Sequence, residues 1–108
     1  MRLFGLRKPT SDTELRKKAS TLSIQGKYQE ALKACDEAIE IAPAEVRNWR
    51  QKGGTLQLLN HHEEALEIFD KVIKLSPKDP FGWLLKHGTF MALERYEEAL
   101  KAIIKSLN

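Results

Sequence analysis

The sequence has little of what small catalytic or metal-binding sites are built from. Its 108 residues include a single cysteine, Cys35, so neither an intrachain disulfide nor a cysteine-based zinc site can form. No apolar run approaches the roughly 18 residues that span a bilayer, and the N-terminus lacks the apolar stretch of a secretory signal. The net charge of +3 is far from the clustered basic composition typical of nucleic-acid-binding domains. These absences predict a cytoplasmic protein of one small domain, without membrane association.

The residues that could bind a metal or act in catalysis have simpler structural explanations. Residues 61–64, His-His-Glu-Glu, resemble a metal site, but adjacent helical residues point about 100° apart, and a polar turn before an acidic first helical turn explains them better. Cys35 is expected to be a small buried hydrophobe. No serine-histidine-acid set stands out, and the Gly53-Gly54 pair lies inside a predicted helix, not in a phosphate-binding loop. We therefore expect no enzyme activity, no metal and no cofactor.

What the sequence does have is internal repetition. A shift of 34 residues aligns Trp49 with Trp83 and Pro43 with Pro77. Residues 12–45 and 46–79 share ten identities in 34 positions. Five columns are identical in all three copies: Lys18/Lys52/Lys86, Thr21/Thr55/Thr89, Glu30/Glu64/Glu98, Ala31/Ala65/Ala99 and Leu32/Leu66/Leu100.

Each copy is predicted to form two helices joined by a short turn. In the second copy, apolar and small residues recur at three- and four-residue steps over about 46–59, and Asn60-His61 forms the turn. A second apolar stripe follows and ends at Pro77, which lacks an amide proton. Small residues are expected where the two helices cross, so Gly53 should meet Ala65. The chain then divides into a flexible segment, 1–11, and a three-repeat domain, 12–108, made of 12–45, 46–79 and 80–108.

This pattern resembles the tetratricopeptide repeat, and the second copy matches its signature best, at Trp49, Gly53, Ala65, Phe69 and Pro77. The resemblance covers residues 12–108 and implies an all-α fold, a right-handed superhelix (α-solenoid) of three antiparallel helix hairpins. It also implies a non-catalytic protein–protein interaction module. The chain departs from the signature with Leu15 at the tryptophan, Lys18, Lys52 and Lys86 at the leucine, Cys35 and Ile103 at the phenylalanine, and His87 at the third glycine.

The resemblance implies that the first helix of each hairpin lines a concave groove. The three first helices carry seven Lys or Arg against two Asp or Glu, a net charge of +5, whereas the second helices sum to −5. The inner face is thus predicted to be positive. Twelve residues at helical spacing away from the core stripe are predicted to line the groove: Thr13, Arg16, Ser20, Ser23, Arg47, Arg50, Gly54, Gln57, Phe81, Leu84, Gly88 and Met91.

The predicted partner is a peptide with an acidic or C-terminal carboxylate part and an apolar part, bound to guanidinium forks at Arg16 and Arg50 and to an apolar pocket on the third copy. One subset of the family grips chaperone C-termini with lysine, two asparagines, lysine and arginine. Column by column, this sequence matches none of these five residues, so that clamp is absent: the columns hold Arg16, Ser20, Gln51, Phe81 and Leu85.

Other interpretations stay open. The arginines are equally explained as solvated surface residues, and Phe81 and Leu84 as ordinary contacts between hairpins. Single-stranded RNA is a second ligand class for a basic inner face, although a regular series of stacking aromatic residues is lacking. A third interpretation is self-association, or a fragment of a longer repeat array, because Ile103, Ile104 and Leu107 would be partly exposed on the last helix.

Overall fold

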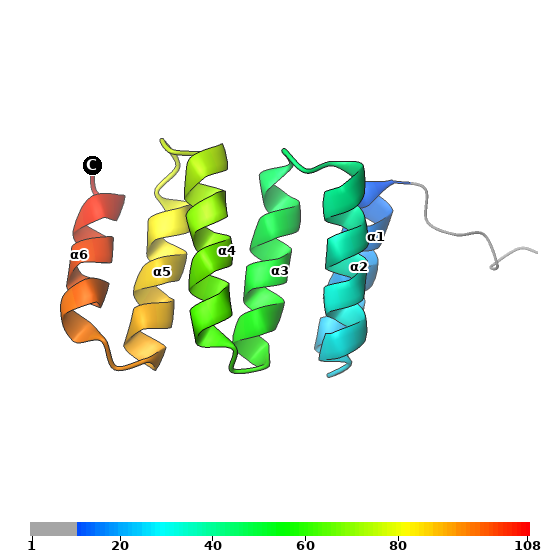
Figure 1. Ribbon diagram of the computed structural model, residues 1–108, viewed down its shortest axis with the longest axis horizontal. Coiled ribbons are helices and arrows are strands. Elements are labelled where there is room, and N and C mark those ends of the chain that lie inside the picture. Colours follow the sequence, from blue (N-terminus) through cyan, green and yellow to red (C-terminus); the bar gives the residue numbers. More distant parts are fainter. Residues whose placement is uncertain (1–10) are drawn as a thin grey trace, which may run out of the picture.

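The computed structural model describes residues 11–108, and these form helices and turns without a strand. The helices are α1 (Asp12–Ile24), α2 (Tyr28–Ile41), α3 (Val46–Leu58), α4 (His62–Leu75), α5 (Phe81–Ala92) and α6 (Tyr96–Ser106). They follow one another along the long axis of the molecule, with α1 partly behind α2 in this view, and are joined by short turns (Figure 1). The first predicted helix of the second copy, about 46–59, is confirmed by α3.

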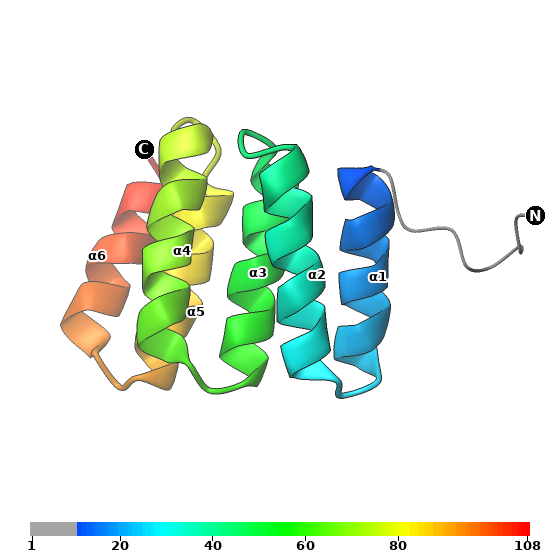
Figure 2. The same ribbon diagram turned by 45° about the vertical axis from the view of Figure 1, so that its right-hand side comes forward.

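The helices pair into three hairpins, α1 with α2, α3 with α4, and α5 with α6, which pack against one another in chain order. Seen in Figure 2, α3 and α5 lie behind α2 and α4, so that first and second helices form two layers. Side-chain hydrogen bonds join neighbouring first helices directly. Ser23 Oγ of α1 lies 3.1 Å from Thr55 Oγ1 of α3, and Gln57 Nε2 of α3 donates to Thr89 Oγ1 of α5 at 2.5 Å. One continuous surface is therefore built from α1, α3 and α5.

Every first helix ends in the same left-handed turn. Gly26, Asn60 and Glu94 stand 34 residues apart and have φ values of 79°, 62° and 58°. In the first hairpin, the amide of Lys27 donates to the carbonyl of Leu22 at 2.8 Å, as a helix that closes with a left-handed residue requires. Glycine takes this conformation freely, asparagine tolerates it, and glutamate adopts it at a cost. The turn predicted at Asn60-His61 is confirmed.

The core runs between the two layers and depends on small residues. Ala31, Ala65 and Ala99 are fully buried on the second helices, as the repeat columns predicted. At Gly53, however, the side chain that an added Cβ would meet first is that of Phe69, not that of Ala65. A Cβ added to Gly53 would lie 2.8 Å from Cζ and 2.9 Å from Cδ1 of the fully buried Phe69 ring. Glycine is needed there because an aromatic ring, and not an alanine, occupies the space opposite.

The lysines in the leucine column join successive hairpins. Lys52 of α3 forms an ion pair with Asp36 of α2, and Lys86 of α5 forms one with Asp70 of α4, each at 2.7 Å. The ammonium of Lys86 also lies 5.2 Å from the ring centroid of Trp83. The lysine stems thus cover apolar surface while their charges meet a carboxylate of the preceding hairpin.

The other departures are also accommodated in the core. Leu15 and Cys35 are buried, and Ile103 is half-buried. His87, in the column that holds Gly53, is half-buried, and its Nδ1 lies 2.8 Å from the carbonyl oxygen of Ala99. The third hairpin therefore keeps the same architecture with a larger side chain at the crossing.

The flexible segment predicted at 1–11 lies outside the described residues, except for Ser11. That residue caps α1, since its hydroxyl accepts a hydrogen bond at 3.1 Å from the amide of Glu14, three residues further along the chain. Within residues 11–108, the helices are too short and too polar for any of them to cross a membrane.

Candidate functional site

A pocket of about 400 Å³ opens on the surface between α1 and α3. Four of the predicted groove residues line it, whereas the sequence analysis missed Lys17 and Gln51. These two stand 34 residues apart, so the repeat register was a signal that could have identified them. The lining residues are Arg16, Lys17, Ser20, Arg47, Arg50 and Gln51.

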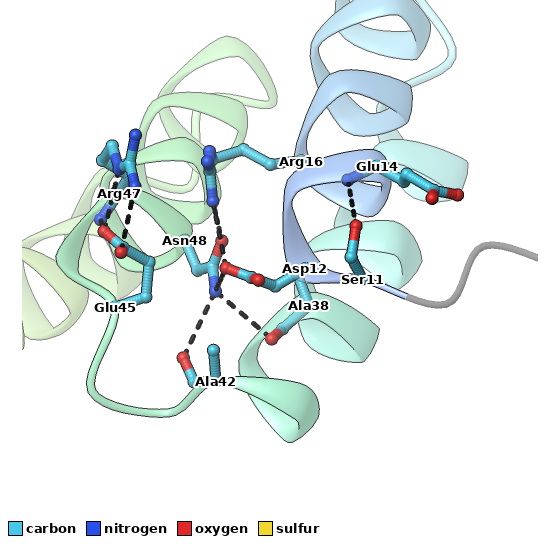
Figure 3. A network of polar contacts seen from close by, with 9 residues as sticks. All are labelled: Ser11, Asp12, Glu14, Arg16, Ala38, Ala42, Glu45, Arg47 and Asn48. Atoms are coloured by element: carbon cyan, nitrogen blue, oxygen red, sulfur yellow. Dashed lines mark hydrogen bonds and ion pairs between the residues drawn. The ribbon is translucent and has the colours of Figure 1, made fainter.

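Arg16 is held in a polar network at the junction of α1, α2 and α3 (Figure 3). Its Nη1 donates to Asn48 Oδ1 at 2.7 Å and approaches Asp12 Oδ2 at 3.3 Å. Asn48 is fully buried, and its Nδ2 donates to the carbonyl oxygens of Ala38 and Ala42, both at 3.2 Å. Asn48, which the sequence analysis did not single out, thus fixes the turn between α2 and α3. Arg16 is engaged in this network and is less available to a ligand than expected.

Arg47 is paired with a neighbour as well. Its Nε lies 2.9 Å from Glu45 Oε1 and its Nη2 lies 3.1 Å from Oε2, which is a two-pronged contact (Figure 3). The hydrogen bonds from Arg47 lower the pKa of the Glu45 carboxyl to about 2. The charge of Arg47 is therefore largely matched by Glu45 at the rim of the pocket.

Arg50 and Lys17 are the two pocket cations that have no hydrogen bond or ion pair with another residue in the described part of the chain. The Arg50 guanidinium carbon instead lies 4.7 Å from the ring centroid of Phe81, at the start of α5. After the internal pairings, the pocket keeps an excess of about two positive charges beside an aromatic ring.

The apolar end of the predicted groove lies on α5. Phe81, Leu84 and Met91 leave 41%, 42% and 46% of their surfaces exposed, which is high for large apolar side chains. They belong to the same row of first helices as the charged pocket, and Phe81 joins the two regions through its contact with Arg50. The surface therefore presents a basic part over α1 and α3 and an apolar part over α5.

Glycines leave room on this surface. A Cβ added to Gly54 or Gly88 would have no heavy atom within 4 Å, so both positions face open space. Ser20 occupies the same column in the first copy and lines the pocket. The three small residues thus keep the middle of each first helix clear of side chains.

Eight of the twelve predicted groove residues lie outside the pocket lining, among them Thr13, Ser23 and Gln57. Ser23 and Gln57 are half-buried, and their polar groups bond to threonines of the next first helix, at the seam between helices. Thr13 is exposed in the first turn of α1. None of the twelve predicted residues is buried.

Cys35 and His61, which the sequence analysis weighed as candidates for chemistry, lie outside the pocket lining. Burial raises the pKa of the Cys35 thiol to about 11, which keeps it protonated and unreactive at neutral pH. His61 Nδ1 lies 3.5 Å from Glu64 Oε1. Among residues 11–108, no three His, Cys, Asp or Glu side chains gather closely enough to hold a metal ion.

Comparisons with known proteins agree with this architecture. Residues 22–86 match the tetratricopeptide repeat family. No curated protein sequence matches the chain. Among solved structures, MamA is similar with a TM-score of 0.83 and 20% identity, over 91% of this chain and 57% of that chain. The second TPR of Spaghetti (RPAP3), bound to the HSP90 peptide SRMEEVD, is similar with a TM-score of 0.80 and 15% identity, over 91% of both chains.

The Yersinia enterocolitica type III secretion translocator chaperone SycD is similar with a TM-score of 0.83 and 16% identity, over 88% of this chain and 71% of that chain. At these identities the comparisons establish the fold, an all-α superhelix of three hairpins. The chain spans little more than half of the length of MamA.

Proposed function

The chain belongs to the tetratricopeptide repeat family, and we propose that it is a non-catalytic adaptor that binds a peptide segment of another protein on the surface of α1, α3 and α5. We call this surface the groove. The observation that carries the proposal is the open pocket of about 400 Å³ with two unmatched cations, continuous through Phe81 with exposed apolar side chains on α5. A surface with both characters suits a peptide that is part acidic and part apolar.

The chemistry of the groove favours an acidic segment or a C-terminal carboxylate. Arg50 offers planar donors to a carboxylate, while Leu84 and Met91 offer contact area to an apolar side chain. The RPAP3 domain of the same fold was solved with a peptide bound, which supports the peptide class. The clamp residues for chaperone C-termini are replaced here, and we do not propose that partner.

A selection from phage-displayed random dodecapeptides tests the proposal, with the immobilised chain as bait. The blocking variant is Gly54→Leu, whose side chain would project into the groove; Gly54→Ala is its matched control, because it adds a single methyl group that contacts no other residue. We expect the native chain and Gly54→Ala to enrich the same peptides, and Gly54→Leu to lose them. The proposal is contradicted if the native chain enriches no peptides, or if Gly54→Leu enriches the same peptides as the native chain. A salt-dependent gel shift of single-stranded RNA would instead favour the RNA alternative.

Self-association through α6 is a second candidate, favoured by one observation. Leu100, Ile104 and Leu107 leave 59%, 50% and 81% of their surfaces exposed. In the column where Asp36 and Asp70 bind lysines of the following hairpins, α6 has Ile104, so this helix face is more apolar than its counterparts. Light scattering of the native chain and of Ile104→Asp tests it; a monomer in both cases rules it out.

A further inference from the structure

We propose that Arg50 determines the specificity of the groove, and that its ligand is an extended peptide with an acidic side chain about three residues from a large apolar side chain. This inference rests on the proposed function and deepens it. It assigns the recognition of the carboxylate to one residue and gives the ligand a spacing.

Arg50 is the arginine of the pocket whose donors are not already engaged. The guanidinium of Arg16 bonds to Asn48 and Asp12, and that of Arg47 bonds to both oxygens of Glu45. Within the described residues, Arg50 has only its contact with Phe81. A carboxylate that enters the pocket can therefore bond to Arg50 without displacing an internal partner.

The contact with Phe81 prepares Arg50 for this role. Its guanidinium carbon lies over the ring at 4.7 Å from the centroid, so one face of the group is covered by carbon. A guanidinium held at its face keeps the N–H donors at its edge, where they match the two oxygens of a carboxylate. The ring also restricts the side chain before binding, which lowers the entropy lost in the complex.

Lys17 is a different kind of cation. It lines the same pocket from α1, is exposed, and has no hydrogen bond, ion pair or ring contact in the described part of the chain. An ammonium group attracts an anion without imposing the planar two-pronged geometry of arginine. Lys17 is thus expected to strengthen binding of acidic peptides in general, and Arg50 to select the position of the acidic residue.

The spacing follows from the row of first helices. Neighbouring packed helices lie roughly 10 Å apart, and an extended peptide advances about 3.3 Å per residue. Arg50 lies on α3, and the exposed Leu84 and Met91 lie on the next first helix, α5. A peptide crossing the row therefore places an acidic and an apolar side chain about three residues apart.

The test repeats the dodecapeptide selection with Arg50→Glu. Lys33→Glu is the matched control: it makes the same change of net charge on α2, at an exposed position outside the pocket. Thermal unfolding by circular dichroism verifies that both variants fold. Arg50→Lys, measured by fluorescence anisotropy with the peptide most enriched by the native chain, separates the guanidinium geometry from its charge.

We expect native-selected peptides to combine Asp or Glu with Leu, Ile, Phe or Met about three positions away. Peptides selected by Arg50→Glu should carry Lys or Arg at the position of the acidic residue and should keep the apolar residue. Peptides selected by Lys33→Glu should show the same acidic and apolar residues as those selected by the native chain. Arg50→Lys should bind the peptide most enriched by the native chain about tenfold more weakly. If the native chain enriches peptides whose acidic position is unchanged in Arg50→Glu, the inference is wrong and the proposed function stands. If the native chain enriches none, both fail.

Discussion

Two adjacent glycines of α3 give a sharp test of the packing. Both Gly53 and Gly54 are in the helix interior, where alanine is favoured over glycine by about 0.5–1 kcal/mol. Their surroundings differ completely. A Cβ on Gly54 meets nothing within 4 Å, whereas a Cβ on Gly53 collides with the ring of Phe69. The same substitution at neighbouring positions should therefore change stability in opposite directions.

The magnitudes follow from these surroundings. Gly54→Ala should raise the free energy of unfolding by about 0.5–1 kcal/mol, since the helical gain is not opposed. At Gly53 the Phe69 ring must move, but it is fully buried and packed among Leu56, Ala65 and neighbouring core residues. Overpacking of this kind costs about 1–3 kcal/mol. Net of the helical gain, Gly53→Ala should lower stability by about 1–2 kcal/mol.

Urea unfolding followed by circular dichroism measures both changes, provided that the slope of the transition is the same in all variants. Making Gly53→Ala in a Phe69→Leu variant tests whether the Phe69 ring causes the loss of stability. Leucine leaves space where the ring stood, so Gly53→Ala should cost less there than in the native chain. Equal shifts at the two glycines, or a cost at Gly53 that persists with Phe69→Leu, would refute the reasoning.

Three further predictions concern single sites. Asn48→Ala should lower the free energy of unfolding by about 2–3 kcal/mol in urea titrations, because a buried side chain that joins three helices loses its bonds; a loss below about 0.5 kcal/mol would show that the network is not structural. Glu94→Gly should raise stability by about 1 kcal/mol, since glycine adopts φ of 58° without strain; no rise in the midpoint contradicts this. Cys35 should react with iodoacetamide at pH 8 at least about a hundredfold more slowly than in urea, because its pKa of about 11 leaves little thiolate. Since the folded state keeps this proton longer than the unfolded state, stability should fall from about pH 9 to about pH 11, and Cys35→Ala should flatten that fall.

Periodicity made the fold predictable. The 34-residue register places small residues, turns and capping groups at equivalent points of three hairpins, and each of these signals is local. The turn at Asn60 and the cap at Ser11 depend on a few neighbouring residues, so the sequence specified them. The close approach of the Phe69 ring to Gly53 was not predicted, because it depends on helix rotation, which spacing along the chain does not determine.

The site was less predictable because side chains of one charge look alike in a sequence. Arg16 and Arg50 were equivalent candidates for binding a carboxylate until their neighbours were known. Glu45 lies two residues from Arg47, so that pairing was within reach of the sequence. The contact between Arg16 and Asn48 joins residues 32 apart and depends on how one hairpin stacks on the next.

That stacking also explains why neighbouring copies of one repeat serve different purposes. The column of Arg16 and Arg50 continues with Leu84, and the column of Asn48 continues with Gly82. Between the first two hairpins the arginine therefore meets an asparagine and stabilises the array, whereas between the next two it meets no such acceptor and rests on Phe81. Loss of one polar partner at the second junction leaves the guanidinium available. In a repeat array, binding capacity can thus arise where the contact between copies is incomplete, and Arg50 stands at that point.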